Sequence, residues 1–310
     1  MFLGHAAVAL AVVGLGAFEL GWSRERALYL GLVAALVATL PDVDMLYALT
    51  GFVGIGPLEP FALAEGFWSA STAVHRSITH SLILAVPVAA GTALVAGDRR
   101  RRFAGLAGLA GLVALVGWGA RPISVVVLIA FVLGAIGAGL LARRLGFGTV
   151  PVFVASAIAL LSHPFGDLFT GSPPQLLYPL HVTVFGSRLT LAPDPTMHLL
   201  GAFFLEMAAI WLGIYAILTL RDEQIRDHLR PRAILGGAYA LAVLVVPPPT
   251  LDVSYQFVFS VVSIGFLGVT PSGRTGVSWP TTVVTGVAAV TVAGFAYTVG
   301  YLVAAGAPIP

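Results

Sequence analysis

Residues 122–142 read PISVVVLIAFVLGAIGAGLLA, a run without a charged side chain that is followed at once by Arg143 and Arg144. A run of about 20 apolar residues is long enough for a helix to cross the hydrocarbon core of a bilayer. The whole chain has this character: 58% of its residues are hydrophobic, 10% are charged and its mean hydropathy is +0.97. Soluble domains usually carry about 25% charged residues. The composition therefore excludes a soluble enzyme and a disordered chain.

The apolar runs also indicate which kind of membrane protein this is. Lipid accepts only helices or closed barrels as spanning structures, and barrel strands would alternate apolar and polar residues. Because the runs here are unbroken, we expect an all-α, polytopic helical membrane protein with about ten transmembrane helices. The predicted spans lie near residues 2–20, 27–50, 77–97, 103–120, 122–142, 149–170, 196–219, 233–249, 254–270 and 281–305.

The arginines predict the orientation of these spans. Cytoplasmic loops of membrane proteins carry an excess of Lys and Arg. With the N-terminus outside, only Arg76, Arg121 and Arg188 of the 16 basic residues fall in outer loops. We therefore expect a multi-pass protein of the inner or plasma membrane with both termini outside. Since the basic residues follow topology, no nucleic-acid partner is expected.

Two of the predicted outer loops are long. Residues 51–74 include Phe67 and Trp68 among prolines, a mixture typical of a loop that rests in the membrane interface. Residues 181–191 alternate around Gly186-Ser187, which predicts a small β-hairpin with a two-residue turn. Long structured loops over one membrane face often serve as lids or binding loops.

Six of the seven histidines and two aspartate motifs map to the predicted outer face. A charged side chain at the bilayer centre costs about 3 kcal/mol on insertion scales, so such groups are expected to meet each other, water or a metal. Imidazole and carboxylate suit zinc and neighbouring divalent ions, and the chain has no Cys to supply a thiolate. We predict one or two divalent ions, zinc first and manganese as the alternative. The predicted ligands are His5, Asp42, His75, His80, His163 and Asp167.

The spacing within this ligand set favours a shared site only in part. His163 and Asp167 are four residues apart, so a helix places them on one side, and Pro164 is expected to kink that turn. His75 and His80 are five residues apart, about 140° around a regular helix. They can share a site only if His75 lies in a loop or a frayed first turn.

We expect a metal-site domain over residues 1–195 and accessory transmembrane helices of unknown role over residues 196–310.

These motifs resemble those of a known family. Their order over roughly residues 1–185 is similar to that of the YdjM-like membrane-bound metal-dependent hydrolases, and more distantly to the zinc-dependent phospholipase C class. The resemblance implies a hydrolase of the inner or plasma membrane that holds a metal. It rests on His5, on Pro41-Asp42-x-Asp44, on His75-Arg76-x-x-Thr79-His80-Ser81 and on His163-x3-Asp167-x2-Thr170-Gly171.

If the chain is such a hydrolase, the depth of the predicted site, in the outer half of the bilayer and beneath two apolar loops, suggests its substrate, and two further residues are expected to take part. We expect hydrolysis, at the outer face, of a lipid or another amphiphilic ester or phosphoester, so that the partners are membrane lipid and a small amphiphilic substrate. Asp44 is expected to act as the catalytic base, with an unligated histidine as the alternative. Arg76 is expected to neutralise negative charge on a phosphoryl oxygen. Two other functions stay open, a structural metal site without catalysis and a metal or solute transporter.

Overall fold

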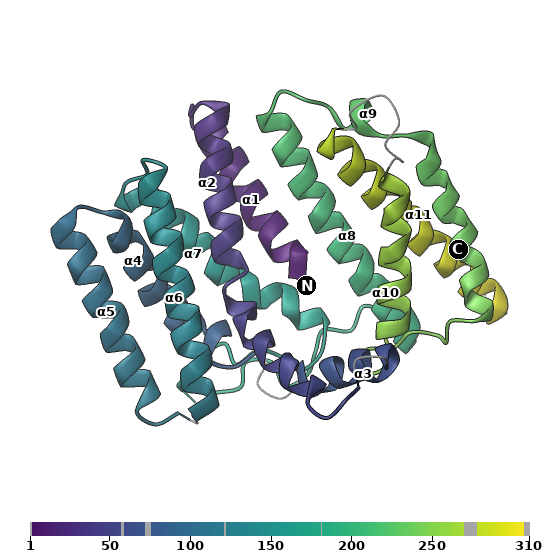
Figure 1. Ribbon diagram of the computed structural model, residues 1–310, viewed down its shortest axis with the longest axis horizontal. Coiled ribbons are helices and arrows are strands. Elements are labelled where there is room, and N and C mark those ends of the chain that lie inside the picture. Colours follow the sequence, from purple (N-terminus) through teal and green to yellow (C-terminus); the bar gives the residue numbers. More distant parts are fainter. Residues whose placement is uncertain are drawn as a thin grey trace. The chain divides into compact units, whose positions relative to one another are not determined.

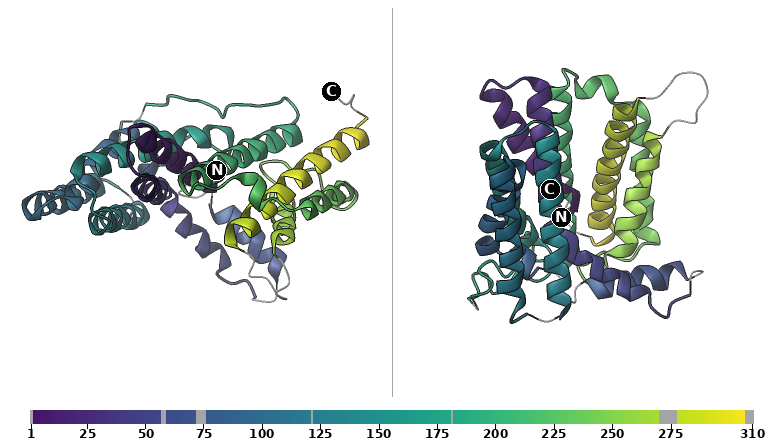
Figure 2. Two further views of the ribbon diagram at one scale, coloured as in Figure 1. Left: turned by 90° about the horizontal axis from the view of Figure 1, so that it is seen from above. Right: turned by 60° about the vertical axis from the view of Figure 1, so that its left-hand side comes forward.

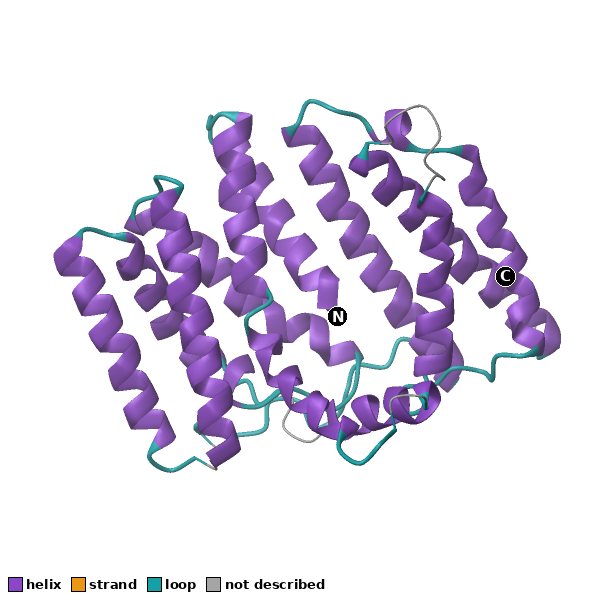
Figure 3. Ribbon diagram, viewed as in Figure 1, coloured by secondary structure: helices purple, strands orange, loops and turns teal. Residues whose placement is uncertain are grey.

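The computed structural model describes residues 2–56, 59–71, 76–120, 122–180, 182–269 and 278–306, without the side chains of Phe2 and Ser71. Helices make up 77% of the chain, and no strand occurs among the described residues (Figure 3). The prediction of an all-α protein is therefore confirmed. The chain divides into two compact units, Met1–Arg188 and Leu189–Pro310.

The first unit is a helical bundle that runs from the purple to the teal part of the chain (Figure 1). Its elements are α1 (Phe2–Glu19), α2 (Arg24–Ala38), the 3-10 helix η1 (Pro41–Phe52), α3 (Pro60–Ser71), η2 (Ile78–His80), α4 (Leu82–Ala96), α5 (Arg99–Gly117), α6 (Pro122–Arg144), α7 (Thr149–Gly166) and η3 (Asp167–Phe169).

Helices α4 and α7 lie at the centre of the first unit. α4 packs against α5, α6 and α7, while α1 and α2 pack against each other and against α7 (Figure 2). The α1–α2 contact depends on small residues, because a Cβ added at Gly31 would lie 2.9 Å from the carbonyl oxygen of Leu10. Such close approach is what holds helices together in lipid, where apolar surface alone gives no preference for protein over lipid tails.

The chain bends sharply between α2 and η1. Pro41 has no N–H group, so it cannot continue the hydrogen bonds of α2, and the two helices meet at 47°. Asp42 and Asp44 lie in the first turn of η1 as a result. α3 packs back against η1. The bend therefore places both carboxylates directly after the end of α2.

The second unit is a smaller helical bundle built around α11. This helix packs against α8, η4 and η5, over a core that includes Tyr239, Phe257 and Tyr297. The elements of this unit are α8 (Pro195–Leu220), α9 (Ile225–His228), η4 (Pro231–Leu244), α10 (Tyr255–Ser263), η5 (Ile264–Gly268) and α11 (Trp279–Ala304).

The prediction of about ten transmembrane helices is wrong in number. By length and composition, four helices in the described ranges can cross a membrane, or five if the bent pair α2–η1 forms one span. Other apolar runs form shorter helices. With 15 residues, α4 is about 22 Å long, less than the roughly 30 Å of the hydrocarbon core. The four long helices are Pro122–Arg144, Thr149–Phe169, Pro195–Leu220 and Trp279–Ala304.

The predicted β-hairpin is also wrong. Residues 182–191 form an irregular loop, and His181 lies outside the described residues. Backbone donors that a hairpin would pair across two strands bond elsewhere. The N–H of Val182 donates to the nearby carbonyl of Leu180, and the N–H of Leu191 donates to Nδ1 of His198 at 3.1 Å. Alternation around a glycine turn was therefore not sufficient to form a ladder here.

Candidate metal centre

Four of the predicted ligands converge in the first unit. They are Asp42 at the start of η1, His80 in η2, His163 near the end of α7 and Asp167 at the start of η3. One ligand atom from each lies within 4.8 Å of the others. His80, His163 and Asp167 are buried, whereas the side chain of Asp42 is 12% exposed. The group therefore has a single more open side, at Asp42.

The separations between these ligand atoms suit one metal ion. In a tetrahedral site with bonds of about 2.1 Å, neighbouring ligand atoms lie about 3.4 Å apart. The Nε2 atoms of His80 and His163 are 3.2 Å apart, and Nε2 of His80 is 3.0 Å from Oδ2 of Asp167. Nε2 of His163 is 3.5 Å from Oδ1 of Asp42. The His80–Asp42 distance of 4.0 Å is longer, so the donor set widens toward Asp42.

A backbone carbonyl fixes the tautomer of His163. Nδ1 of this ring lies 2.7 Å from the carbonyl oxygen of Ala38, which can only accept a hydrogen bond. Ala38 is the last residue of α2, where carbonyl groups lack the helical partners of an interior turn. Nδ1 of His163 therefore carries the proton. In the neutral ring, Nε2 presents its lone pair to the other ligands.

The carboxylate of Asp44 and the hydroxyl of Thr79 fix the tautomer of His80. Oγ1 of Thr79 donates to Oδ2 of Asp44 at 3.2 Å, so it accepts the proton of His80 Nδ1 at 2.9 Å. The Nε2 lone pair of His80 then faces that of His163 across 3.2 Å. Two facing lone pairs repel each other, and a cation between them removes the repulsion. Partners of this kind orient histidine ligands in metal sites.

The charges of the cluster also fit a divalent cation. Asp42, Asp44 and Asp167 contribute three carboxylates, and Arg76 contributes one guanidinium. With neutral imidazoles, these four side chains carry a net charge of −2. Buried charge is costly unless it is balanced. A divalent ion at the four ligand atoms would bring this sum to zero.

Arg76 joins three segments around the group. Its backbone N–H donates to Oδ2 of Asp44 at 2.9 Å. Its guanidinium donates through Nη1 to the carbonyl of Asp167 at 3.0 Å and through Nη2 to Oγ1 of Thr170 at 2.8 Å. Its backbone has a φ of 70°, which is unusual for a residue with a side chain. Gly171 also has a positive φ, and a Cβ there would lie 3.0 Å from Nη1 of Arg76. The guanidinium therefore holds the segment of Arg76 against the segment that contains Asp167 and Thr170.

The remaining predicted ligands lie in different places. Nε2 of His5 is 3.2 Å from Oδ1 of Asp167, and its ring stacks on that of His163 with centroids 3.8 Å apart. His5 is thus beside the four ligand atoms without being one of them. His75 lies outside the described residues. The roles predicted for these residues, and for Asp44 and Arg76, stay predictions.

Sequence reasoning missed the acceptors that orient the ligands. The carbonyl of Ala38 carries no side-chain signal, and its only indication was Pro41 shortly after it. The carbonyl of Ser172, 3.1 Å from Nη1 of Arg76, had no signal either. Thr170 belongs to the His163-x3-Asp167-x2-Thr170-Gly171 motif, but the motif does not indicate its bond to Arg76.

Replacing Asp44 with Asn is expected to weaken divalent-metal binding about 10- to 100-fold, the usual effect of removing a partner that orients a ligand. The change keeps the size of the side chain but removes the charge that draws the Thr79 hydroxyl and the His80 proton. Competition with a chromogenic chelator measures the affinity. Asp98→Asn, at an exposed carboxylate, is the matched control. An unchanged affinity in Asp44→Asn would show that Asp44 does not orient His80.

Comparison with known proteins identifies a family for this chain. A family model described as YdjM inner membrane protein matches residues 1–247. The chain belongs to this family. The match includes all four converging residues and extends beyond residue 185, where the recognisable motifs end. As a YdjM family member, the chain is an inner membrane protein, in agreement with its apolar helices. No curated protein and no solved structure matches the chain.

Proposed function

We propose that this YdjM family member is a membrane-embedded, metal-dependent hydrolase that acts on a lipid or another amphiphilic ester or phosphoester. The proposal rests on the facing Nε2 atoms of His80 and His163, to which Asp42 and Asp167 add carboxylate oxygens. The motif resemblance to membrane-bound metal-dependent hydrolases supports the reaction class. Zinc suits a set of two imidazoles and two carboxylates, and manganese is the alternative.

The wide side of the group supports catalysis over a purely structural role. A bound divalent ion would supply an acidified water and would polarise the scissile group. Structural zinc sites are closed by four protein ligands, whereas catalytic sites keep a position open, so catalysis here requires that Asp42 leaves its position free or that water adds a fifth ligand. Among the distances from Nε2 of His80 to the other three ligand atoms, the longest is the 4.0 Å to Asp42, which is also the most exposed of the four side chains. Substrate would therefore approach from the Asp42 side.

The contacts of the neighbouring residues suggest how they share the work. Asp44 already accepts from Arg76 and Thr79, so in our proposal it orients His80 and is not the base. Oδ1 of Asp167 holds the proton of His5 on Nε2, which leaves Nδ1 of His5 to accept a proton from the attacking water. Nε of Arg76 has no acceptor among the described residues, which supports its contact with a developing negative charge.

Exposed apolar side chains on η1, the helix that carries Asp42, and on α3 support an amphiphilic substrate. η1 begins beside Asp42 and carries Leu46, Leu49 and Phe52, which are 58%, 52% and 40% exposed. Phe61 of α3, the helix that packs on η1, is 75% exposed. A substrate with an acyl chain can contact these side chains while its polar group reaches the open side of the cluster.

Hydrolysis by the full-length protein in lipid vesicles tests the proposal. Release of phosphorylated headgroup and release of fatty acid are measured separately, for wild type, metal-stripped wild type and His163→Ala, with His228→Ala of the second unit as control. We expect one of the two products from wild type and His228→Ala only, with activity restored to stripped wild type by added metal. Stoichiometric metal without either product would favour a structural site instead.

A further inference from the structure

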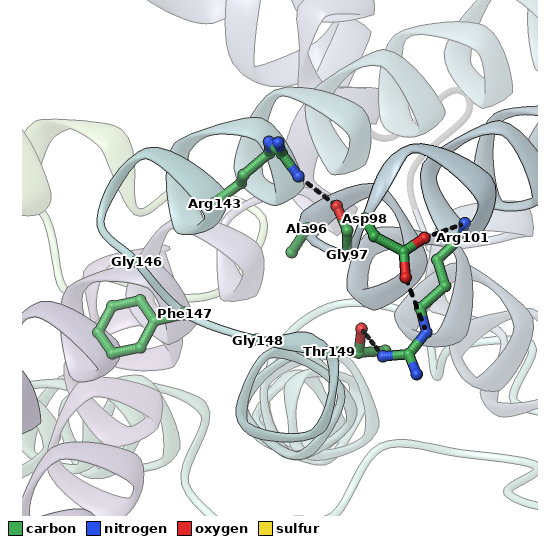
Figure 4. A pocket seen from close by; sticks show the side chains of 9 residues that line it. All are labelled: Ala96, Gly97, Asp98, Arg101, Arg143, Gly146, Phe147, Gly148 and Thr149. Atoms are coloured by element: carbon green, nitrogen blue, oxygen red, sulfur yellow. Dashed lines mark hydrogen bonds and ion pairs between the residues drawn. The ribbon is translucent and has the colours of Figure 1, made fainter.

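A second polar site lies at the opposite end of α7 from the metal centre. A cavity of about 420 Å³ opens between the α4–α5 turn and the α6–α7 turn (Figure 4). Thr149, the first residue of α7, lines it, so the rise of 1.5 Å per residue puts the cavity about 21 Å from His163. Gly97, Asp98, Arg101, Arg143 and Phe147 also line the cavity.

Two arginines from different helices line this cavity. Arg101 of α5 donates to Oγ1 of Thr149 at 3.4 Å, and Arg143 at the end of α6 donates to the carbonyl of Gly97. Figure 4 shows these two side chains reaching the cavity from different sides. The guanidinium of Arg26 lies 5.9 Å from the ring centroid of Phe147, which forms part of the wall. Two positive charges therefore line this opening, and Arg26 lies near its Phe147 wall without lining it.

One carboxylate offsets part of this charge. Asp98 accepts a hydrogen bond from the backbone N–H of Arg101 at 2.9 Å, and this bond holds the pKa of Asp98 below its usual value. Asp98 is therefore ionised at neutral pH and pairs with the Arg101 guanidinium at 3.7 Å. Together with Arg101 and Arg143, it leaves the cavity lining with a net charge of about +1, which suits the single negative charge of a phosphodiester.

The position of the cavity narrows the choice of anion. It lies at the ends of α6 and α7, two helices long and apolar enough to cross a membrane. The ends of such helices lie at the level of the lipid headgroups, where phosphate is the abundant anion. Guanidinium groups bind phosphate oxygens through paired hydrogen bonds. Phe147 and Ala96 add an apolar wall next to the arginines.

We propose that this cavity binds a phosphate group, and that anionic phospholipid headgroups of the surrounding leaflet supply it. Free inorganic phosphate shares this chemistry and is the other source that the site can accept. The site is separate from the metal centre and does not depend on hydrolysis. Its role would be to hold an anionic lipid against the arginine-rich start of α5 and end of α6, beside the start of α7.

Lipid binding to the purified full-length protein in neutral detergent tests this proposal. Native mass spectrometry measures the affinities for phosphatidylglycerol, which is anionic, and phosphatidylcholine, which is zwitterionic. Arg101→Gln removes a cavity arginine, and Arg100→Gln removes an exposed arginine of the same helix that does not line the cavity. We expect Arg101→Gln to weaken phosphatidylglycerol binding about tenfold, as for loss of one charge-assisted hydrogen bond, and Arg100→Gln to leave it unchanged.

Competition with millimolar inorganic phosphate distinguishes the two sources. Phosphatidylglycerol binding that phosphate does not displace supports the lipid headgroup, and displacement that requires Arg101 supports free phosphate as well. Thermal melting of both variants verifies that they fold. Equal affinity of wild type and folded Arg101→Gln for phosphatidylglycerol, or equal binding of the two lipids by wild type, would overturn the proposal.

Discussion

Replacing Asp167 with Ala is expected to lower the free energy of unfolding by about 3 kcal/mol, because it removes one partner from a buried charge network. Oδ1 of Asp167 lies 3.2 Å from Nε2 of His5 and 3.5 Å from Nη2 of Arg76, and its Oδ2 lies 3.0 Å from Nε2 of His80. The truncation leaves the buried Arg76 guanidinium without that carboxylate. The same variant should lose its bound metal.

Denaturant unfolding of the detergent-solubilised protein measures this effect, and Asp167→Asn is the matched variant. The amide keeps the shape of the side chain and an oxygen that can still accept from His5 or Arg76, so we expect a smaller loss of stability. Both variants should bind metal poorly because a neutral amide is a weak ligand. Asp167→Ala with the stability of wild type would show that this network does not hold the segments together.

Replacing His80 with Ala is expected to reduce hydrolysis to the level of metal-stripped protein. His80 is fully buried, and its Nε2 lies within 4.0 Å of ligand atoms from His163, Asp42 and Asp167. Asp44→Asn leaves the four ligands in place and acts through its contacts with Thr79 beside His80 and with Arg76, so its activity should fall between those of wild type and His80→Ala.

Vesicle hydrolysis at several metal concentrations separates these two variants. Excess metal should restore much of the activity of Asp44→Asn, because its ligands are intact and only the affinity is reduced. It should restore none in His80→Ala. If His80→Ala instead retained more activity than Asp44→Asn, His80 would not be a ligand, and the roles proposed for the two residues would be wrong.

The converging residues were predictable from their chemistry. Isolated histidines and aspartates are costly in lipid, so their recurrence in an apolar chain indicates a common site. The structure brings Asp42, His80, His163 and Asp167 together. The order of the ligands in space was not predictable, because it depends on the α2–η1 bend and on the short 3-10 helix that carries His80.

The number of spans was not predictable from hydropathy. An apolar run shows that a segment tolerates lipid, but it does not show where a helix begins and ends. The run at residues 77–97 shows this, because α4 begins only at Leu82, after the 3-10 turn that presents His80. The left-handed backbone conformation of Arg76 could not be predicted from the sequence either, since no glycine stands there to indicate it.

Metal content tests the central claim most directly. Elemental mass spectrometry is performed on detergent-purified wild type, His163→Ala and His228→Ala, all prepared without chelators. His228 lies in the second unit, so its variant controls for adventitious binding to imidazole. We expect at least one zinc or manganese ion per chain in wild type and in His228→Ala, and little in His163→Ala. Metal-free wild type, or His163→Ala with the full metal content, would contradict a metal centre at Asp42, His80, His163 and Asp167.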